Sequence, residues 1–139
     1  MRGRKAFYSD PAEMQRHIDA YFTACKGEYQ KTADGQYALD KHGNPRLINA
    51  RPPTINGLVQ ALGFGTRKSL SDYQRKAAFR KTVTDAKMRI EQYAEERLFD
   101  RDGFSGARFT LVCNFGWKPC PDEPDNADED TGTVRIVYQ

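Results

Sequence analysis

The sequence predicts a mainly α-helical protein with an N-terminal helical domain, a long central helix pair and a C-terminal β-strand. Three observations predict this fold class. Apolar residues recur at helical spacing in five segments. Turn-forming residues fill the stretch 28–51. Residues 133–138 alternate in polarity as a strand does. We therefore expect three regions, with bounds 1–78, 79–118 and 119–139.

The first predicted helix follows a basic N-terminal segment that contains Arg2, Arg4 and Lys5. Ser9 or Asp10 is expected to cap the helix, and a proline follows at its first position, where the missing N–H costs nothing. The helix should run to about residue 25. Its apolar stripe consists of Met14, Ile18, Tyr21, Phe22 and Cys25.

Residues 28–51 form an insertion between helices. Turn signals stand at residues 33–35 and 41–45, and short apolar runs at 37–39 and 47–48. We predict a small β-hairpin with its turn at 42–45. Such a hairpin is marginal alone, so it must lean on the helices or on another subunit.

Residues 53–79 read as two short helices joined by a tight turn. Thr54 is expected to cap the first helix, and Gly63 to end it in a left-handed conformation. Phe64 can fill the corner, and Thr66 is the expected cap of the second helix. This layout is typical of a helix-turn-helix. The alternative is a helical hairpin with a solvated charged face.

The second of these helices has two faces. Leu70, Tyr73 and Ala77 fall on one arc and are expected to face inward. The opposite arc carries four residues that we predict to bind DNA. They are Arg67, Lys68, Ser71 and Arg75.

Positive charge is concentrated on this part of the chain. Residues 51–89 hold nine Lys and Arg against two Asp, whereas 118–139 hold two basic and six acidic residues. Such a basic stretch is the footprint of a surface that meets phosphates. Further phosphate contacts are predicted for Lys76, Arg80, Lys81, Arg2, Arg4 and Lys5.

A long helix is predicted from about residue 78 to 99. Its apolar stripe has heptad spacing and consists of Phe79, Val83, Ala86, Ile90 and Tyr93. The stripe either packs inside the monomer or forms a seam between subunits. We favour oligomerisation because the helix is long for so small a domain. A further helix is expected over 106–114.

The C-terminal region begins with an acidic, proline-rich stretch, 119–130, which cannot build a core. The strand that follows places Val134, Ile136 and Tyr138 on one side. Because no partner is evident within the chain, we expect the strand to pair between subunits, as in a shared barrel. The alternative is a disordered tail.

Signatures of several enzyme classes are absent. The sequence has no GxxxxGK[ST], GxSxG or HExxH, and its three cysteines form no CxxC. We therefore expect neither an enzyme nor a cofactor or metal site. Cys25 and Cys113 are expected to be buried and Cys120 exposed. No apolar run is long enough for a membrane span and no signal peptide is visible, so we expect a cytoplasmic protein.

Residues 57–118 carry several motifs in a fixed order. They are a GL…LGF turn, an R.SL.DY helix start, an AK.RIE.Y.E.RL helix and a closing.GA.F.L.N.GWK. This set resembles the small terminase subunits, the DNA-packaging proteins of tailed double-stranded DNA phages.

The resemblance implies a non-enzymatic subunit in the cytoplasm of an infected bacterium. It would bind double-stranded DNA at the packaging start site of concatemeric phage DNA. It would also recruit and regulate the large terminase subunit, which supplies the ATPase and nuclease. The resemblance further implies a homo-oligomeric ring of about 8–11 copies. In parts of the family the C-terminal segment forms a barrel on the ring axis. The family's recognition helix corresponds to residues 66–76.

Two departures from the family pattern matter. The 28–51 insertion is longer than expected, and the tail is acidic without a basic extension. DNA contact is therefore expected at the helix-turn-helix and not at the tail. Two other functions stay open. One is a helix-turn-helix transcriptional regulator that acts as a two-fold dimer. The other is an assembly protein whose basic face is only solvated.

Overall fold

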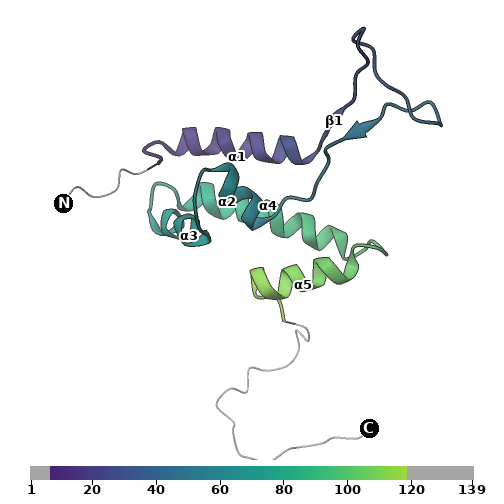
Figure 1. Cartoon of the computed structure of the whole chain (residues 1–139). Helices are drawn as coiled ribbons and strands as arrows, with labels where there is room; N and C mark the ends of the chain where they lie inside the picture. Colours follow the sequence, from purple (N-terminus) through teal and green to yellow (C-terminus); the bar gives the residue numbers. More distant parts are fainter. Residues whose placement is uncertain (1–6, 119–139) are drawn as a thin grey trace, which may run out of the picture.

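The computed structural model describes residues 7–118, and this part of the chain is mainly helical, as predicted (Figure 1). Its elements are α1 (Pro11–Cys25), β1 (Glu28–Tyr29), β2 (Leu47–Ile48), α2 (Ile55–Ala61), α3 (Arg67–Arg75), α4 (Arg80–Arg97) and α5 (Phe104–Phe115). The predicted strand over 133–138 and the basic residues Arg2, Arg4 and Lys5 lie outside the described residues.

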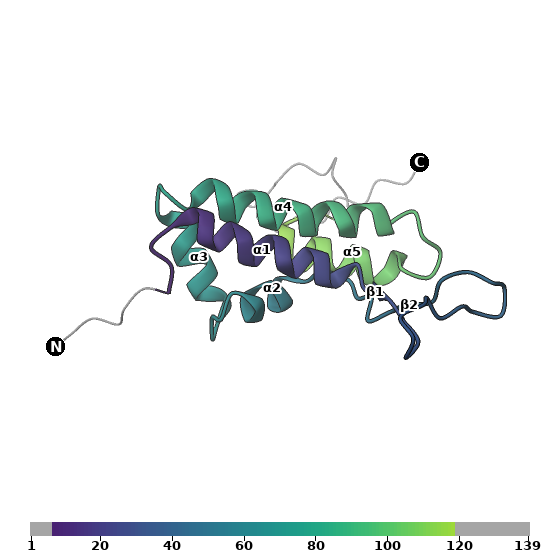
Figure 2. The same ribbon diagram turned by 90° about the horizontal axis from the view of Figure 1, so that it is seen from above.

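Helix α4 is central to the fold, because α1, α3 and α5 all contact it (Figures 1 and 2). Asp10 caps α1 by accepting a hydrogen bond from the backbone N–H of Ala12 at 3.0 Å. The predicted stripe of α1 is confirmed, since all five of its side chains are buried. Local signals were sufficient here, because a cap, a proline and one apolar stripe all favour the same helix.

The turn between α2 and α3 also follows the prediction. Thr54 caps α2, and its hydroxyl accepts the backbone N–H of Gly57 at 2.9 Å. Gly63 adopts the left-handed conformation (φ 82°) that ends the helix, and Phe64 is buried in the corner. Thr66 stands at the N-cap of α3, although its side chain makes no capping bond.

One expectation for α3 is wrong. The helix ends at Arg75, and Lys76 has an extended backbone (ψ 127°). Ala77 therefore leaves the inward arc and is exposed. Leu70 and Tyr73 are buried as expected.

An aromatic cluster holds α3 against the N-terminal segment. The Tyr73 ring stacks on Phe64, with ring centroids 5.3 Å apart, and meets Phe79 edge-on at 4.9 Å. The backbone N–H of Tyr8 donates to the Tyr73 hydroxyl at 3.0 Å, and the Tyr8 hydroxyl donates to the Leu62 carbonyl at 2.8 Å. These contacts hold α3 and the N-terminal segment together at one end of the molecule.

The heptad stripe of α4 packs inside the chain. Phe79, Val83, Ala86 and Ile90 are all at most 6% exposed and belong to the core of the single chain. This corrects our favoured interpretation for these four residues, since a buried side chain offers no surface to another subunit. Tyr93 is half-buried. Heptad spacing did not distinguish the two possibilities, because a helix packs in the same way against its own chain and against a neighbour.

Helix α5 begins two residues earlier than predicted and ends at Gly116, which is left-handed (φ 71°). Leu111 is buried, whereas Phe109 is 70% exposed. Cys113 is exposed, contrary to expectation. Apolar residues surround this helix on all sides, so its sequence did not indicate which face packs on α4.

Residues 28–48 form an arm that extends away from the helical body as two loops (Figures 1 and 2). The predicted hairpin is only partly correct. Residues 47–48 do form a strand, but they pair with Glu28–Tyr29 in an antiparallel sheet. Residues 37–39 contribute only isolated bridges, Lys31 with Tyr37 and Leu39 with Pro45.

The arm is built from two similar turns, eight residues apart. In the first, Thr32 N–H donates to the Gln36 carbonyl at 2.7 Å around Gly35 (φ 83°). In the second, Asp40 N–H donates to the Asn44 carbonyl at 2.8 Å around Gly43 (φ 82°). Only glycine adopts this backbone conformation without a steric penalty.

Three backbone hydrogen bonds join the segments at the base of these turns. Gln30 donates to Arg46 at 2.8 Å, Arg46 to Ala38 at 2.9 Å, and Ala38 to Gln30 at 2.9 Å. The three residues thus form a closed set, each donating to one partner and accepting from the other. No residue from 26 to 52 is buried, so the arm is ordered by these backbone bonds and by exposed side-chain contacts. Among the latter are the edge-on Tyr29–Tyr37 contact and the hydrogen bonds that Asp40 accepts from the backbone N–H groups of His42 and Asn44.

Candidate nucleic-acid interface

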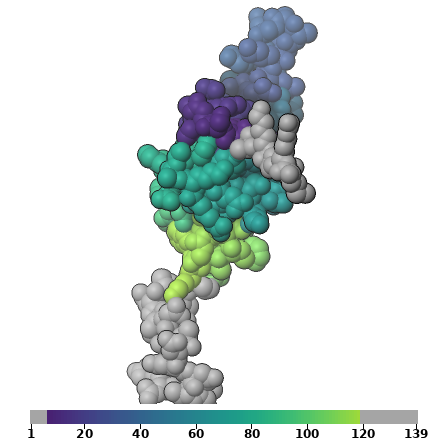
Figure 3. All heavy atoms as spheres, turned by 90° about the vertical axis from the view of Figure 1, so that its left-hand side faces the viewer, coloured from purple at the N-terminus to yellow at the C-terminus, as the bar shows by residue number. Residues whose placement is uncertain are grey.

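The predicted DNA-binding residues of α3 lie at the end of the molecule opposite the arm (Figures 1 and 2). Figure 3 views this end, where the teal surface of α2 to α4 lies between α1 and α5. Arg67, Lys68 and Arg75 are exposed, and Ser71 is half-buried. The structure thus leaves the outer face of α3 open to solvent.

The structure brings Ser71, Arg75 and Arg80 together around one shallow hollow of about 550 Å³. Gln74 and Thr84 complete its lining. The hollow forms because α4 starts only five residues after α3 ends, so the last turn of one helix faces the first turns of the other. The Arg80 guanidinium donates to the Arg75 carbonyl at 3.3 Å, which holds it at the edge of the hollow.

The acidic neighbours of this surface compensate little of its charge. Arg75 and Asp72 are 3.6 Å apart, with side chains 80% and 47% exposed. Lys81 and Asp85 are 2.8 Å apart, with side chains 87% and 51% exposed. Ion pairs this exposed contribute well under about 1 kcal/mol, so both cations can exchange partners. Lys76 lies over the Tyr73 ring, 4.3 Å from its centroid.

Sequence reasoning assigned no role to three polar residues at the hollow, which are Gln74, Thr84 and Lys87. The Lys87 ammonium donates to the Gln74 side-chain carbonyl at 2.6 Å, and the Gln74 amide donates to the Thr84 hydroxyl at 3.1 Å. Burial lowers the pKa of Lys87. The spacing of positions 80, 84 and 87 was the available signal, since residues three and four apart share a helix face.

A family model described as DNA-packaging protein gp3 matches residues 3–120. The chain belongs to this family of phage DNA-packaging proteins. As a gp3-family protein it has a role in packaging phage DNA and acts in the infected host cell. No curated protein and no solved structure matches the chain.

Arg67 of this gp3-family protein is held by two amides from other helices. Its Nε donates to the Asn56 side-chain oxygen at 2.6 Å, and its Nη1 to that of Asn114 at 3.0 Å. The guanidinium therefore links α3 to α2 and α5. Replacing Arg67 would perturb the packing of these helices, so it is a poor probe of DNA binding alone.

Within residues 7–118 of the gp3-family protein, the structure contains no cluster of three or more His, Cys, Asp or Glu side chains that could hold a metal ion. None of the helices in this part of the chain has the length and apolar character needed to cross a bilayer.

Proposed function

We propose that this protein is the recognition subunit of the packaging machinery, equivalent to a small terminase subunit. In this proposal it binds double-stranded DNA at the packaging start site and recruits and regulates the large terminase ATPase–nuclease. It carries out no chemistry itself. The observation that supports the proposal most is the grouping of Arg75, Arg80 and Ser71 on one exposed surface of a phage DNA-packaging protein.

The α3–α4 surface suits a phosphate backbone. Lys68, Arg75, Lys76, Arg80 and Lys81 are all exposed there, and each presents donors on a long side chain. The Ser71 hydroxyl adds a neutral donor and acceptor between the cations. Base contacts would come from the first turns of α3, as in a helix-turn-helix.

Assembly into a ring of about 8–11 copies is part of the proposal, and heterologous contacts between copies close such rings. Two exposed apolar surfaces are candidates for these contacts. The arm exposes Tyr29, Tyr37, Leu39 and Leu47, and α5 exposes Phe104 and Phe109. Residues 28–48 carry three basic and three acidic side chains, and α5 carries only Arg108. Surfaces with so little net charge suit a protein neighbour better than DNA.

The test of DNA binding measures affinity over a range of salt concentrations. Lys68→Ala, Arg75→Ala and Arg80→Ala, combined in one protein, should weaken binding to DNA. The log–log salt slope should fall by about 0.9 for each phosphate that the variant no longer neutralises. The matched control combines Lys31→Ala, Lys41→Ala and Arg46→Ala, which removes three exposed cations of the arm and should leave the affinity and the slope unchanged. Unchanged affinity and slope in the folded triple variant would remove the α3–α4 surface from the interface.

Native mass spectrometry of the full chain tests the assembly. A single closed species of high copy number agrees with the ring. A stable dimer without larger species would refute the ring and favour a transcriptional regulator. If that dimer still binds DNA with full affinity, ring assembly would be refuted while the proposed DNA binding would stand.

A further inference from the structure

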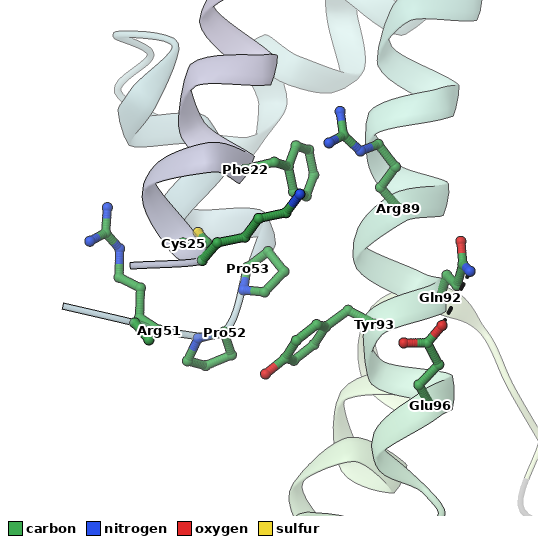
Figure 4. Close-up of a pocket in the computed structure, with 11 residues that line it drawn as sticks. Phe22, Cys25, Arg51, Pro52, Pro53, Arg89, Gln92, Tyr93 and Glu96 are labelled. Atoms are coloured by element: carbon green, nitrogen blue, oxygen red, sulfur yellow. Dashed lines mark hydrogen bonds between the residues drawn. The ribbon is translucent and has the colours of Figure 1, made fainter. Parts of the chain in front are cut away.

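A groove of about 680 Å³ lies between the end of α1, residues 50–53 and α4 (Figure 4). Its wall is apolar and rich in rings. Phe22 and Cys25 come from α1, Pro52 and Pro53 from the segment before α2, and Tyr93 from α4. Phe22 and Cys25 are each 6% exposed, so they form a fixed part of this wall.

Cationic side chains surround this apolar wall. Lys26 and Arg51 are exposed, and within residues 7–118 neither forms a salt bridge. Arg89 stacks on Phe22, with its Cζ 3.9 Å from the ring centroid, and pairs with Asp19 at 3.1 Å. The acidic residue in the lining is Glu96, at one end of the groove, where it accepts a hydrogen bond from Gln92.

This combination suits an extended peptide with prolines and acidic residues. Proline-rich segments dock in grooves lined with aromatic rings, because their extended backbone loses little conformational entropy on binding. Carboxylates form charge-assisted hydrogen bonds with guanidinium and ammonium groups. A phosphate backbone would pair with the cations but would leave the apolar wall without a partner.

We propose that residues 119–130 of the same chain dock in this groove. The segment reads PCPDEPDNADED, with three prolines and six carboxylates. Pro124 matches the ring-lined wall, and the carboxylates that follow it match the cations at Lys26, Arg51 and Arg89. The proposal does not depend on DNA binding or on ring formation.

The segment starts close enough to reach the groove. The Trp117 indole donates to the Glu91 carboxylate at 2.8 Å, so the described chain ends beside α4. Glu91 lies between Arg89 and Tyr93 in sequence, although on another face of α4. A helix with its side chains is about 10–12 Å across. An extended chain covers about 3.3 Å per residue, so roughly six residues pass around α4. If these are residues 118–123, Pro124 and four carboxylates remain to reach the groove, namely Asp125, Asp128, Glu129 and Asp130.

Docking there has a consequence for the proposed DNA surface. Six carboxylates on a free segment would compete with phosphates for the cations of α3 and α4. Held at the groove, the segment places part of this negative charge beside Lys26, Arg51 and Arg89 instead. Lys68, Lys76 and Lys81 are thus the alternative partners of the segment, and an experiment can compare them directly with Lys26.

Zero-length carbodiimide cross-linking of the full-length protein, followed by peptide mass spectrometry, tests the proposal. The expected product joins Lys26 to a carboxylate of residues 119–130, in greater yield than products at Lys68, Lys76 or Lys81. Arg51→Glu should lower the Lys26 yield several-fold, because it reverses a neighbouring charge. The matched control is Arg108→Glu, an exposed residue of α5 outside the groove, which should leave the yield unchanged.

Three outcomes in the cross-linking yields, and a fourth in isotopically mixed samples, would overturn the proposal. One is dominance of products at Lys68, Lys76 or Lys81, and another is the absence of any Lys26 product. The third is a Lys26 yield that Arg51→Glu leaves unchanged, with circular dichroism showing a folded variant. Isotopically mixed samples identify the chain involved. Products that join labelled to unlabelled protein would refute docking within one chain and assign the groove to a neighbour's segment.

Discussion

Replacing Gly57 by alanine should destabilise the protein, although alanine is the better helix former. Gly57 lies in the first turn of α2, directly against Tyr21 of α1. A methyl group there would overlap the Tyr21 hydroxyl. It would also lie 2.9 Å from the ring carbon Cζ and 3.0 Å from the Thr54 hydroxyl. The two Tyr21 atoms belong to the contact that holds α2 on α1, and the Thr54 hydroxyl caps α2.

The size of the destabilisation follows from the displacement of the Tyr21 side chain. The Tyr21 hydroxyl accepts the Thr54 N–H at 2.9 Å and donates to the Thr54 carbonyl at 3.4 Å. Displacing the ring weakens both bonds, at about 1 kcal/mol each. Overpacking lowers the free energy of unfolding by a further amount of about 1–3 kcal/mol, and the higher helix propensity of alanine offsets about 1 kcal/mol of this loss. We expect Gly57→Ala to lower the free energy of unfolding by about 2–4 kcal/mol.

Urea unfolding followed by circular dichroism measures this change. The matched control is Gly106→Ala, the same substitution in α5, where no atom lies within 4 Å of the added methyl group. Gly106→Ala should raise the free energy of unfolding by about 0.5–1 kcal/mol, because only backbone entropy and propensity change. The two variants should therefore shift stability in opposite directions.

A double-mutant cycle with Tyr21→Phe identifies the atom responsible. Without the hydroxyl, the methyl group of Gly57→Ala overlaps less of the residue 21 side chain. The loss in free energy of unfolding caused by Gly57→Ala should therefore be smaller by at least about 1 kcal/mol in the Tyr21→Phe background. Additive effects within about 0.5 kcal/mol would refute the proposed overlap. A Gly57→Ala protein as stable as the parent would refute the whole explanation.

Two further predictions concern tyrosine and tryptophan hydrogen bonds. Burial, followed by the charges of its neighbours, raises the pKa of Tyr8 above its ordinary value of 10.0. The folded state then favours the neutral phenol, so its contribution to stability is present below pH 10 and is lost as the pH rises further. Tyr8→Phe should lower the free energy of unfolding by about 1 kcal/mol at pH 7, because the bond to Leu62 is lost. Above about pH 10, the free energy of unfolding of the variant should decline less with rising pH than that of the parent protein. Trp117→Phe removes the bond to Glu91 and should lower the free energy of unfolding by about 1 kcal/mol, measured by circular dichroism; an unchanged value would show that water replaces this bond without loss.

Local signals predicted much of the helical fold. The caps at Asp10 and Thr54, and the stop at Gly63, each depend on the chemistry of one residue and its immediate neighbours. The buried stripe of α1 depends on one clear period. These features need no knowledge of the rest of the chain, so a single sequence was enough.

Features that depend on distant residues were not predictable in this way. The pairing of residues 28–29 with 47–48 is a ladder of two residues, too short to show alternation. The burial of Val83 and Ile90 inside the chain depends on where α1 and α3 lie, which heptad spacing does not specify. Ala77 was misplaced because a backbone change at Lys76 ended the helix early.

The candidate site also has one part that the sequence predicted and one part that it did not. The open face with Lys68 and Arg75 follows from the period of α3 and was predicted residue by residue. The hollow it shares with Arg80 depends on the angle between α3 and α4, which no sequence pattern encodes. The spacing of positions 80, 84 and 87 places Lys87 on the same face of α4 as Arg80, but its bond to Gln74 depends on the same interhelical angle, because Gln74 lies on the other helix.

The way the arm is held together has a consequence for how this protein can change. Its order comes from backbone bonds among Gln30, Ala38 and Arg46, from two glycine turns and from exposed side-chain contacts within the arm, and its side chains contribute nothing to the core. Substitutions at Tyr29, Tyr37 or Leu39 therefore leave the stability of the helices untouched. The arm can acquire or lose a binding preference while the scaffold that carries it stays the same. It is the part of the molecule where binding specificity can be engineered at the least risk to the folding of the helices.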